Sequence, residues 1–171
     1  MSTLSSNSAA RALAALIALC FAAWLYGWRV VDPSSVQWLL HGDPAQHYIG
    51  SVFFSGEPWH WPPGRIDGLG DASTSVVFTD SIPLLAFAAK LLASIGLWPK
   101  DWQYFGLWML ACHALAGWHA VALLQRLGVR NGVALQTGAA FFVCAPMLLL
   151  RAYGHEALMA HFVVRSEEHH V

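Results

Sequence analysis

Apolar residues in this chain form long runs that are separated by polar segments. The runs cover residues 12–31, 82–98, 102–124 and 133–150, and a short fifth run begins at Ala157 and stops at Val164. A helix needs about 20 consecutive apolar residues to cross a bilayer, so the fifth run is too short. The first, third and fourth runs predict transmembrane helices over about residues 12–31, 102–125 and 132–150.

The first run follows a serine-rich start that carries Arg11. A cleaved signal peptide is the alternative interpretation of such a segment. The run is long for a signal peptide, and the residues before Trp24 offer no clean small-x-small cleavage site. We therefore expect an uncleaved transmembrane helix whose amino-terminal end lies in the cytoplasm.

The second run differs from the others because polar residues interrupt it. Lys90 lies at its centre, where a charge costs about 2.5–3.5 kcal/mol against membrane insertion. Its start contains Asp80 and Pro83. The pattern predicts a helix over about residues 80–98 that lies in the membrane interface, with Asp80 or Ser81 as its N-cap. A fourth transmembrane helix at this place is the alternative.

The number of transmembrane helices decides which polar residues share a side of the membrane. With three helices, Arg126 and Arg130 lie in the cytoplasm, in agreement with the positive-inside tendency. The loop over residues 32–75 then lies outside, together with the segment that follows residue 150. With four helices, these two segments lie on opposite faces and a common site cannot form.

The composition agrees with an all-α membrane protein. Hydrophobic residues make up 57% of the 171 residues and charged residues 11%, against about a quarter charged in an ordinary soluble domain. The formal net charge of −1 gives no basic surface for nucleic acid. Cys20, Cys112 and Cys144 lie within apolar runs, so we expect free thiols that face lipid or the helix core.

The segment that follows the first run holds the densest group of candidate catalytic residues. Asp43 followed by Pro44 is typical of a helix start with Asp43 as N-cap. His47 would lie on the same helical face, four residues later. One interpretation is a capped interfacial helix without chemistry. The other is a site in which Asp43 acts as a general base or binds a metal ion, with His47 beside it.

Two further groups are candidates for substrate binding. Trp61 belongs to the segment Trp59-His60-Trp61, which fits either an aromatic belt at the interface or a stacking platform for a sugar or lipid headgroup. Arg151 and His155 would share a helical face if the helix of the fourth run continues. An arginine at this place could hold a phosphate through paired hydrogen bonds. The alternative interpretation is that the Arg151 side chain only extends to the membrane interface.

The histidines of the third run have a structural interpretation. His113 and His119 lie six residues apart, which is about 240° around a helix, so they do not form one ligand pair. This spacing gives little support to a haem- or metal-binding protein. Ionisable side chains within membranes usually face other helices, and we expect neutral interhelical hydrogen bonds beside small residues such as Gly106 and Gly117.

The order of these features resembles the N-terminal part of the GT-C superfamily of membrane glycosyltransferases, and within it an uncharacterised bacterial family of polytopic membrane proteins. The resemblance extends from about Gly42 to His161. The residues that carry it are Gly42-Asp43 to His47, Trp61-Pro62-x-Gly64, Phe78-Thr79-Asp80-Ser81-Ile82-Pro83-Leu84, Gln103-Tyr104-Phe105-Gly106-Leu107-Trp108 and Arg151-x-x-Gly154-His155-x-Ala157-Leu158.

The resemblance implies transfer of a sugar from a polyprenyl-phosphate donor at the outer face of the bacterial cytoplasmic membrane. Asp43 would be the general base or would help to hold a divalent ion such as Mg²⁺ or Mn²⁺, and Asp80 would be a second catalytic acidic group. The substrate-binding residues would be His47, Trp61, Arg151 and His155. The partners would be membrane lipid, the polyprenyl-phosphate-linked sugar and further membrane helices.

Members of that superfamily resemble bundles of eight or more transmembrane helices, whereas only three are expected here. Residues 1–164 would form the N-terminal part of such a module, and residues 165–171 form a charged tail. We therefore expect a truncated and inactive chain. The alternative from a different class is a small non-enzymatic membrane protein that associates with partners through Gly- and Ala-rich helix faces.

Overall fold

The chain is mostly helical. The computed structural model describes residues 2–69 and 73–160; the expected charged tail and His161 lie outside these ranges. The elements in chain order are α1 (Ser2–Tyr26), α2 (Trp28–Val31), the 3-10 helix η1 (Gln37–Leu39), α3 (Asp43–Gly56), β1 (Arg65–Ile66), β2 (Thr74–Ser75), α4 (Pro83–Ser94), α5 (Phe105–Arg126), α6 (Gly132–Val143), α7 (Pro146–Arg151) and the 3-10 helix η2 (Glu156–Ala160).

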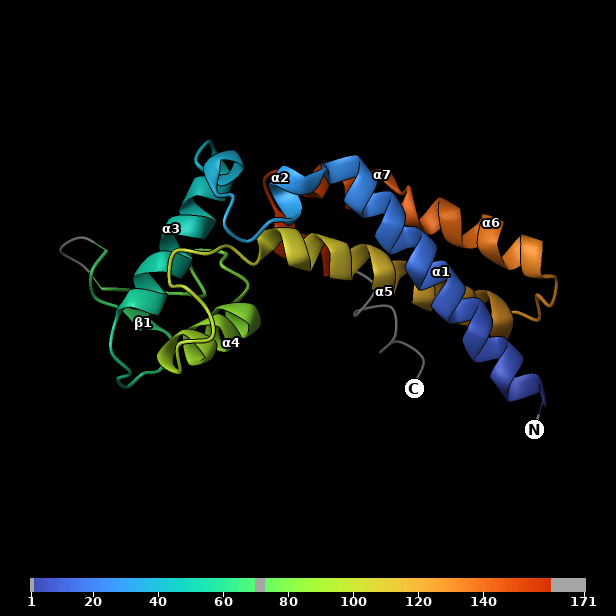
Figure 1. The fold of residues 1–171 in the computed structure, drawn as a ribbon, viewed down its shortest axis with the longest axis horizontal. Coiled ribbons are helices and arrows are strands. Elements are labelled where there is room, and N and C mark those ends of the chain that lie inside the picture. Colours follow the sequence, from blue (N-terminus) through green and yellow to red (C-terminus); the bar gives the residue numbers. More distant parts are fainter. Residues whose placement is uncertain (1, 70–72, 161–171) are drawn as a thin grey trace.

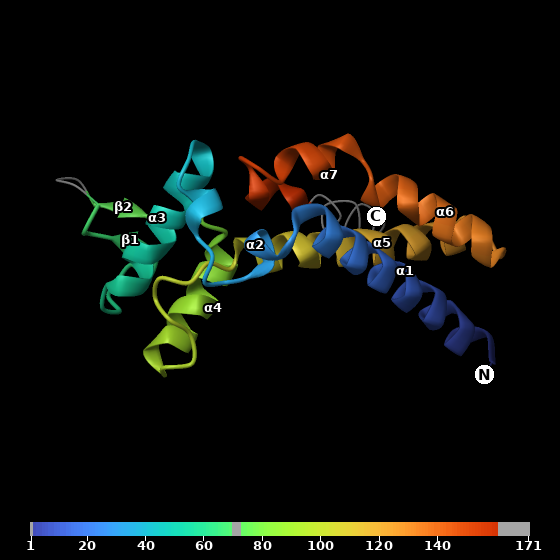
Figure 2. The ribbon, with the colours of Figure 1, turned by 45° about the horizontal axis from the view of Figure 1, so that its top comes forward.

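The elements form a long helical bundle with a smaller lobe at one end. Helices α1, α5 and α6 run side by side in the bundle, and α3, α4 and the strands make up the lobe (Figures 1 and 2). The strands pair antiparallel, Arg65 with Ser75 and Ile66 with Thr74. This hairpin is an addition to the helical fold that the sequence predicts.

Three helical segments are long and apolar enough to cross a membrane: Asn7–Tyr26, Phe105–Arg126 and Gly132–Arg151. Only 17%, 33% and 22% of their most apolar windows are buried inside the protein. Most of their apolar surface therefore faces outward, which is unfavourable in water but favourable in lipid. The three segments agree with the three predicted spans and indicate a membrane protein.

Two of the predicted helices are interrupted within the apolar runs. Gly27 adopts φ +72° between α1 and α2, a left-handed conformation that glycine adopts readily. Pro146 begins α7 after a break that follows Val143. Proline lacks the amide hydrogen that would continue α6 and restricts the residue before it. The predicted helices over 12–31 and 132–150 are therefore present, and each contains an interruption.

Small residues allow α1 and α5 to approach each other closely. Ala14, Ala18 and Ala22 recur every four residues along α1 and are all buried. On α5, a Cβ added at Gly117 would lie 2.8 Å from the carbonyl oxygen of Ala14. Close backbone contact through small residues is the usual way in which membrane helices pack.

A buried histidine links the same two helices. The Nε2 atom of His113 lies 3.3 Å from the hydroxyl of Tyr26, and its Nδ1 atom lies 2.9 Å from the carbonyl oxygen of Met109. The expected interhelical hydrogen bond of His113 is thus confirmed. The three cysteines are free, as predicted, with Cys112 buried and the other two exposed on the bundle.

Gln103 connects the bundle to the start of the lobe. Its side-chain amide donates to the carbonyl oxygens of Val30 at 3.0 Å and Asp32 at 2.8 Å, and its Oε1 atom accepts from the amide of Gly106 at 2.9 Å. Both ends of this buried side chain are therefore satisfied. The bonds hold the end of α2 against the start of α5.

Helix α4 belongs to the lobe and is shorter than predicted. It begins after Ile82, which adopts φ +50°, so neither Asp80 nor Ser81 is its N-cap as expected. Lys90 is only 2% exposed, and its Nζ atom lies 4.1 and 4.7 Å from the ring centres of Phe54 and Trp59. Burial lowers the pKa of Lys90, while the aromatic rings favour its charged form. The four-helix alternative would instead place this lysine in a membrane span.

We predict that Gly106→Ala destabilises the protein, because the added Cβ would collide with the carbonyl oxygen of Val30. Overpacking of this kind costs about 1–3 kcal/mol. The matched control is Gly132→Ala, which meets open space in the first turn of α6. Thermal unfolding in detergent should show a lower midpoint for the first variant only, and equal midpoints would contradict the close packing of α5 on α2.

Candidate functional site

The first two turns of α3 carry the acid and the imidazole that the sequence analysis selected. Gly42 is the N-cap, with φ +65°, so Asp43 is the first helical residue rather than the cap. A carboxylate in the first turn is favoured by the helix dipole. Asp43 is exposed and His47 is buried. Their spacing of four residues places both on one face of the helix.

His47 contacts a glutamate from the far end of the described chain. Its Nδ1 atom lies 2.8 Å from Oε2 of Glu156 in η2, and the two residues are 3% and 0% exposed. The indole of Trp108 in α5 donates to the carbonyl oxygen of Glu156 at 2.7 Å. Helix α3 of the lobe, η2 and helix α5 of the bundle therefore meet at this contact.

One oxygen of this glutamate has no partner among the described residues. Oε1 of Glu156 is buried and accepts no hydrogen bond within residues 2–69 and 73–160. Leaving a buried acceptor unsatisfied is costly, so such atoms often mark sites of function rather than of stability. Oε1 of Glu156 is thus able to accept one further hydrogen bond.

The segment that contains Asp80 lies against the same turn of α3. The hydroxyl of Ser81 donates to the carbonyl oxygen of His47 at 2.6 Å, and the phenol of Tyr104 donates to the carbonyl oxygen of Ser81. Burial raises the pKa of Tyr104, so the phenol remains a donor at neutral pH. Asp80 is exposed beside this buried network.

The backbone of this segment is strained. Asp80 has φ +51° and the β-branched Ile82 has φ +50°, which is a rare conformation for residues other than glycine. Each such residue costs about 1–3 kcal/mol and persists only where its surroundings hold it. The hydrogen bonds of Ser81 supply that constraint. The strained turn that contains Asp80 thus lies beside α3.

Arg151 and His155 are not on one continuous helix, so the condition for a shared helical face is not met. Helix α7 ends at Arg151, and Gly154 adopts φ +155° before η2 begins. One backbone bond remains, because the amide of His155 donates to the carbonyl oxygen of Arg151 at 3.2 Å. Arg151 is half-buried and His155 is exposed. His155 directly precedes Glu156 in the chain, but its side chain is exposed whereas that of Glu156 is buried.

Trp61 is separated from this group by helix α3. Asp43 and His47 lie in the first two turns of α3, whereas Trp61 lies beyond its last residue, Gly56. At about 1.5 Å per residue, the helix alone spans about 20 Å. Trp61 is 85% exposed and precedes Pro62, which lines an open hollow beside the hairpin.

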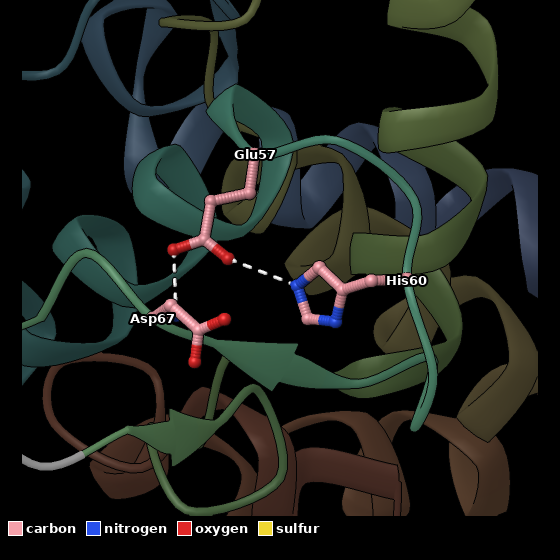
Figure 3. A group of neighbouring side chains, drawn as sticks. All are labelled: Glu57, His60 and Asp67. Carbon is pink, nitrogen blue, oxygen red and sulfur yellow. Dashed lines mark hydrogen bonds and ion pairs between the residues drawn. The ribbon is translucent and has the colours of Figure 1, made fainter.

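The described residues do not fit a divalent ion at Asp43. Nδ1 of His47 contacts Glu156 and leaves Nε2 for a ligand, but no third metal-ligating side chain of the described residues lies close to both Asp43 and His47. In the described part of the chain, the group of three close metal-ligating side chains is Glu57, His60 and Asp67, after the other end of α3 (Figure 3). No step at Asp43 is therefore derived through a metal ion.

Glu156 was not selected as a site residue from the sequence. Its signal is a charged residue directly before the short fifth apolar run, because a carboxylate that becomes buried needs a partner. His47, which could supply that partner, lies 109 residues earlier. Spacing along the chain gives no indication of such a distant pair.

Comparison with known proteins identifies one family. A family model described as Domain of unknown function (DUF6311) matches residues 15–164. The match covers the second half of the first apolar segment, the whole of the other two and the lobe. No curated protein and no solved structure matches the chain.

We predict that His47→Ala destabilises the protein by about 3–5 kcal/mol, because it leaves Glu156 buried without its partner. The double variant His47→Leu with Glu156→Leu should recover most of this loss, since removing both polar groups leaves none unpaired. Exposed His41 supplies the control, and His41→Ala should change the free energy of unfolding by less than about 0.5 kcal/mol. Unfolding in detergent measures all three, and equal stability of His47→Ala and the control would contradict the buried contact.

Proposed function

This chain belongs to the DUF6311 family, and we propose that it is a membrane glycosyltransferase module of the GT-C kind. The proposed reaction transfers a sugar from a polyprenyl-phosphate donor to an acceptor hydroxyl at the outer face of the bacterial cytoplasmic membrane. The observation that carries the proposal is the contact between His47 and Glu156. It joins the lobe to η2, which follows the third apolar segment, where the bundle would leave the lipid.

The residues around this contact have the chemistry that the reaction needs. The acceptor oxygen would attack the anomeric carbon while the bond from that carbon to the phosphate breaks. The exposed carboxylate of Asp43 would take the proton from the acceptor hydroxyl, and the polyprenyl phosphate would leave with the electron pair. Glu156 would hold the imidazole of His47 in one orientation one turn away.

The remaining groups would bind the substrates. The guanidinium of Arg151 is suited to a phosphate because it donates paired hydrogen bonds, and His155 follows it within four residues. Asp80 would supply a second acidic group from the strained turn beside α3. Trp61, on the far side of the lobe, would stack on a distant part of the sugar acceptor.

A membrane orientation follows from the basic residues of the bundle. The Nε atom of Arg11 donates to Oε1 of Gln125 at 2.8 Å, so the start of α1 lies beside the end of α5. Arg126 and Arg130 follow at the same end, away from the lobe. By the positive-inside tendency, we place this end in the cytoplasm and the lobe outside, with α4 in the interface.

We predict that Asp43→Asn lowers sugar transfer by about 100-fold or more, the usual cost of losing a general base, with expression unchanged. The measurement is transfer from a radiolabelled polyprenyl-phosphate hexose in membranes that contain the full protein. The matched control is Asp101→Asn, an exposed aspartate before α5, which should keep its activity. Unchanged transfer in Asp43→Asn would overturn the assignment and favour the non-enzymatic membrane protein.

A second prediction concerns the orientation. In intact cells, a membrane-impermeant maleimide should label Ser34→Cys, in the exposed turn after α2. It should label Arg130→Cys, between α5 and α6, only after the membrane is made permeable. The native protein serves as the control for the exposed thiols of Cys20 and Cys144. The reverse pattern would place the lobe in the cytoplasm and contradict transfer at the outer face.

A further inference from the structure

Three metal-ligating side chains meet after the carboxyl end of α3. Glu57 follows the last residue of the helix, His60 lies in the next segment, and Asp67 follows β1. One ligand atom from each lies within 4.8 Å of the others. Figure 3 shows the two carboxylates and the imidazole turned toward one another. The set is held by the fold rather than by one local turn.

The separations are close to those of a metal site. Bonds of about 2.0–2.2 Å from nitrogen and oxygen to zinc place tetrahedral ligands about 3.4 Å apart. Donor atoms within 4.8 Å of one another reach this spacing with side-chain movements of about 1 Å. His60 and Asp67 have room for such movements, since their side chains are 25% and 51% exposed.

The carboxylate of Glu57 is fixed and ionised. Its Oε1 atom accepts from the amides of Asp67 at 2.7 Å and Gly68 at 2.6 Å, and its Oε2 atom lies 3.2 Å from Nε2 of His60. Burial alone would raise the pKa of Glu57, but these hydrogen bonds outweigh it and hold the pKa below its usual value. The anchored oxygen leaves Oε2 oriented toward the other two ligands.

The positively charged side chains near the cluster do not occupy all of its ligand atoms. The Nε atom of Arg65 binds one oxygen of Asp67 at 2.6 Å, and the other oxygen remains for a ligand role. Lys90 interacts electrostatically with Glu57, but its Nζ atom donates to the carbonyl oxygen of Pro58. The cluster therefore retains two carboxylates and an imidazole that can coordinate a cation.

We propose that Glu57, His60 and Asp67 bind one divalent transition-metal ion, with zinc as the preferred occupant. An imidazole with carboxylates suits zinc and its neighbours better than magnesium or calcium, which favour oxygen ligands alone. Three protein ligands leave the fourth position of zinc to water. The ion would tie the end of α3 to the hairpin. This site is independent of Asp43 and of the proposed sugar transfer.

The test is titration of the full chain in detergent with Zn²⁺ by calorimetry, and with Co²⁺ followed by its visible absorption. We expect one ion per chain at this site. His60→Gln and Asp67→Asn should each weaken Zn²⁺ binding at least 10-fold and change the Co²⁺ spectrum. The matched control, His41→Gln, replaces an exposed histidine at the start of the lobe and should bind as the native protein does.

The alternative is that the three side chains only hold the hairpin by hydrogen bonds. In that case Zn²⁺ binding would be absent, or it would be the same in His60→Gln, Asp67→Asn and His41→Gln, and either result would overturn the proposal. The two variants keep Glu57 and its backbone bonds, so a folded hairpin is expected in both. Sugar transfer by Asp43→Asn is measured separately, so failure of one proposal is distinguishable from failure of the other.

Discussion

The position of the lobe on the bundle depends on the buried contact between His47 and Glu156. Taking both polar side chains out of water is unfavourable, and their attraction across 2.8 Å offsets this cost only in part. Such a contact adds little net stability. It does favour one arrangement, because any shift of α3 against η2 would leave two buried polar groups without partners. The candidate site lies at this junction, where the buried contact fixes α3 relative to η2.

The other contacts at this junction work in the same way. Gln103 donates to two carbonyl oxygens near the end of α2, and Ser81 donates to the carbonyl oxygen of His47. Each connects a side chain of one segment to the backbone of another. Within the bundle, by contrast, contact is made through small residues such as Gly117. Apolar packing thus aligns the long helices, and polar side chains set the angle at which the lobe leaves them.

The length of the apolar runs was sufficient to predict the long helices but not their interruptions. A run of apolar residues has a length, and length decides whether a helix can cross a bilayer. The break before Pro146 arises because proline lacks the amide hydrogen that a continuous helix needs. Run length alone does not indicate this break, since the flanking residues are apolar. No sequence pattern predicted the two-residue strands. So short a hairpin depends on hydrogen bonds such as those to the carboxylate of Glu57, rather than on a run of strand-forming residues.

The site shows the same division between local and distant information. The shared face of Asp43 and His47 was predictable because it needs only a helix and a spacing of four. The partner of His47 was not predictable. Glu156 lies 109 residues away along the chain, and no local sequence pattern indicates that the two side chains are in contact. Asp80 is intermediate. Its chemistry was visible in the sequence, but its position beside α3 depends on a left-handed turn that Ser81 and Tyr104 hold in place. Local rules therefore select the reactive groups, and buried polar contacts between distant segments decide which of them act together.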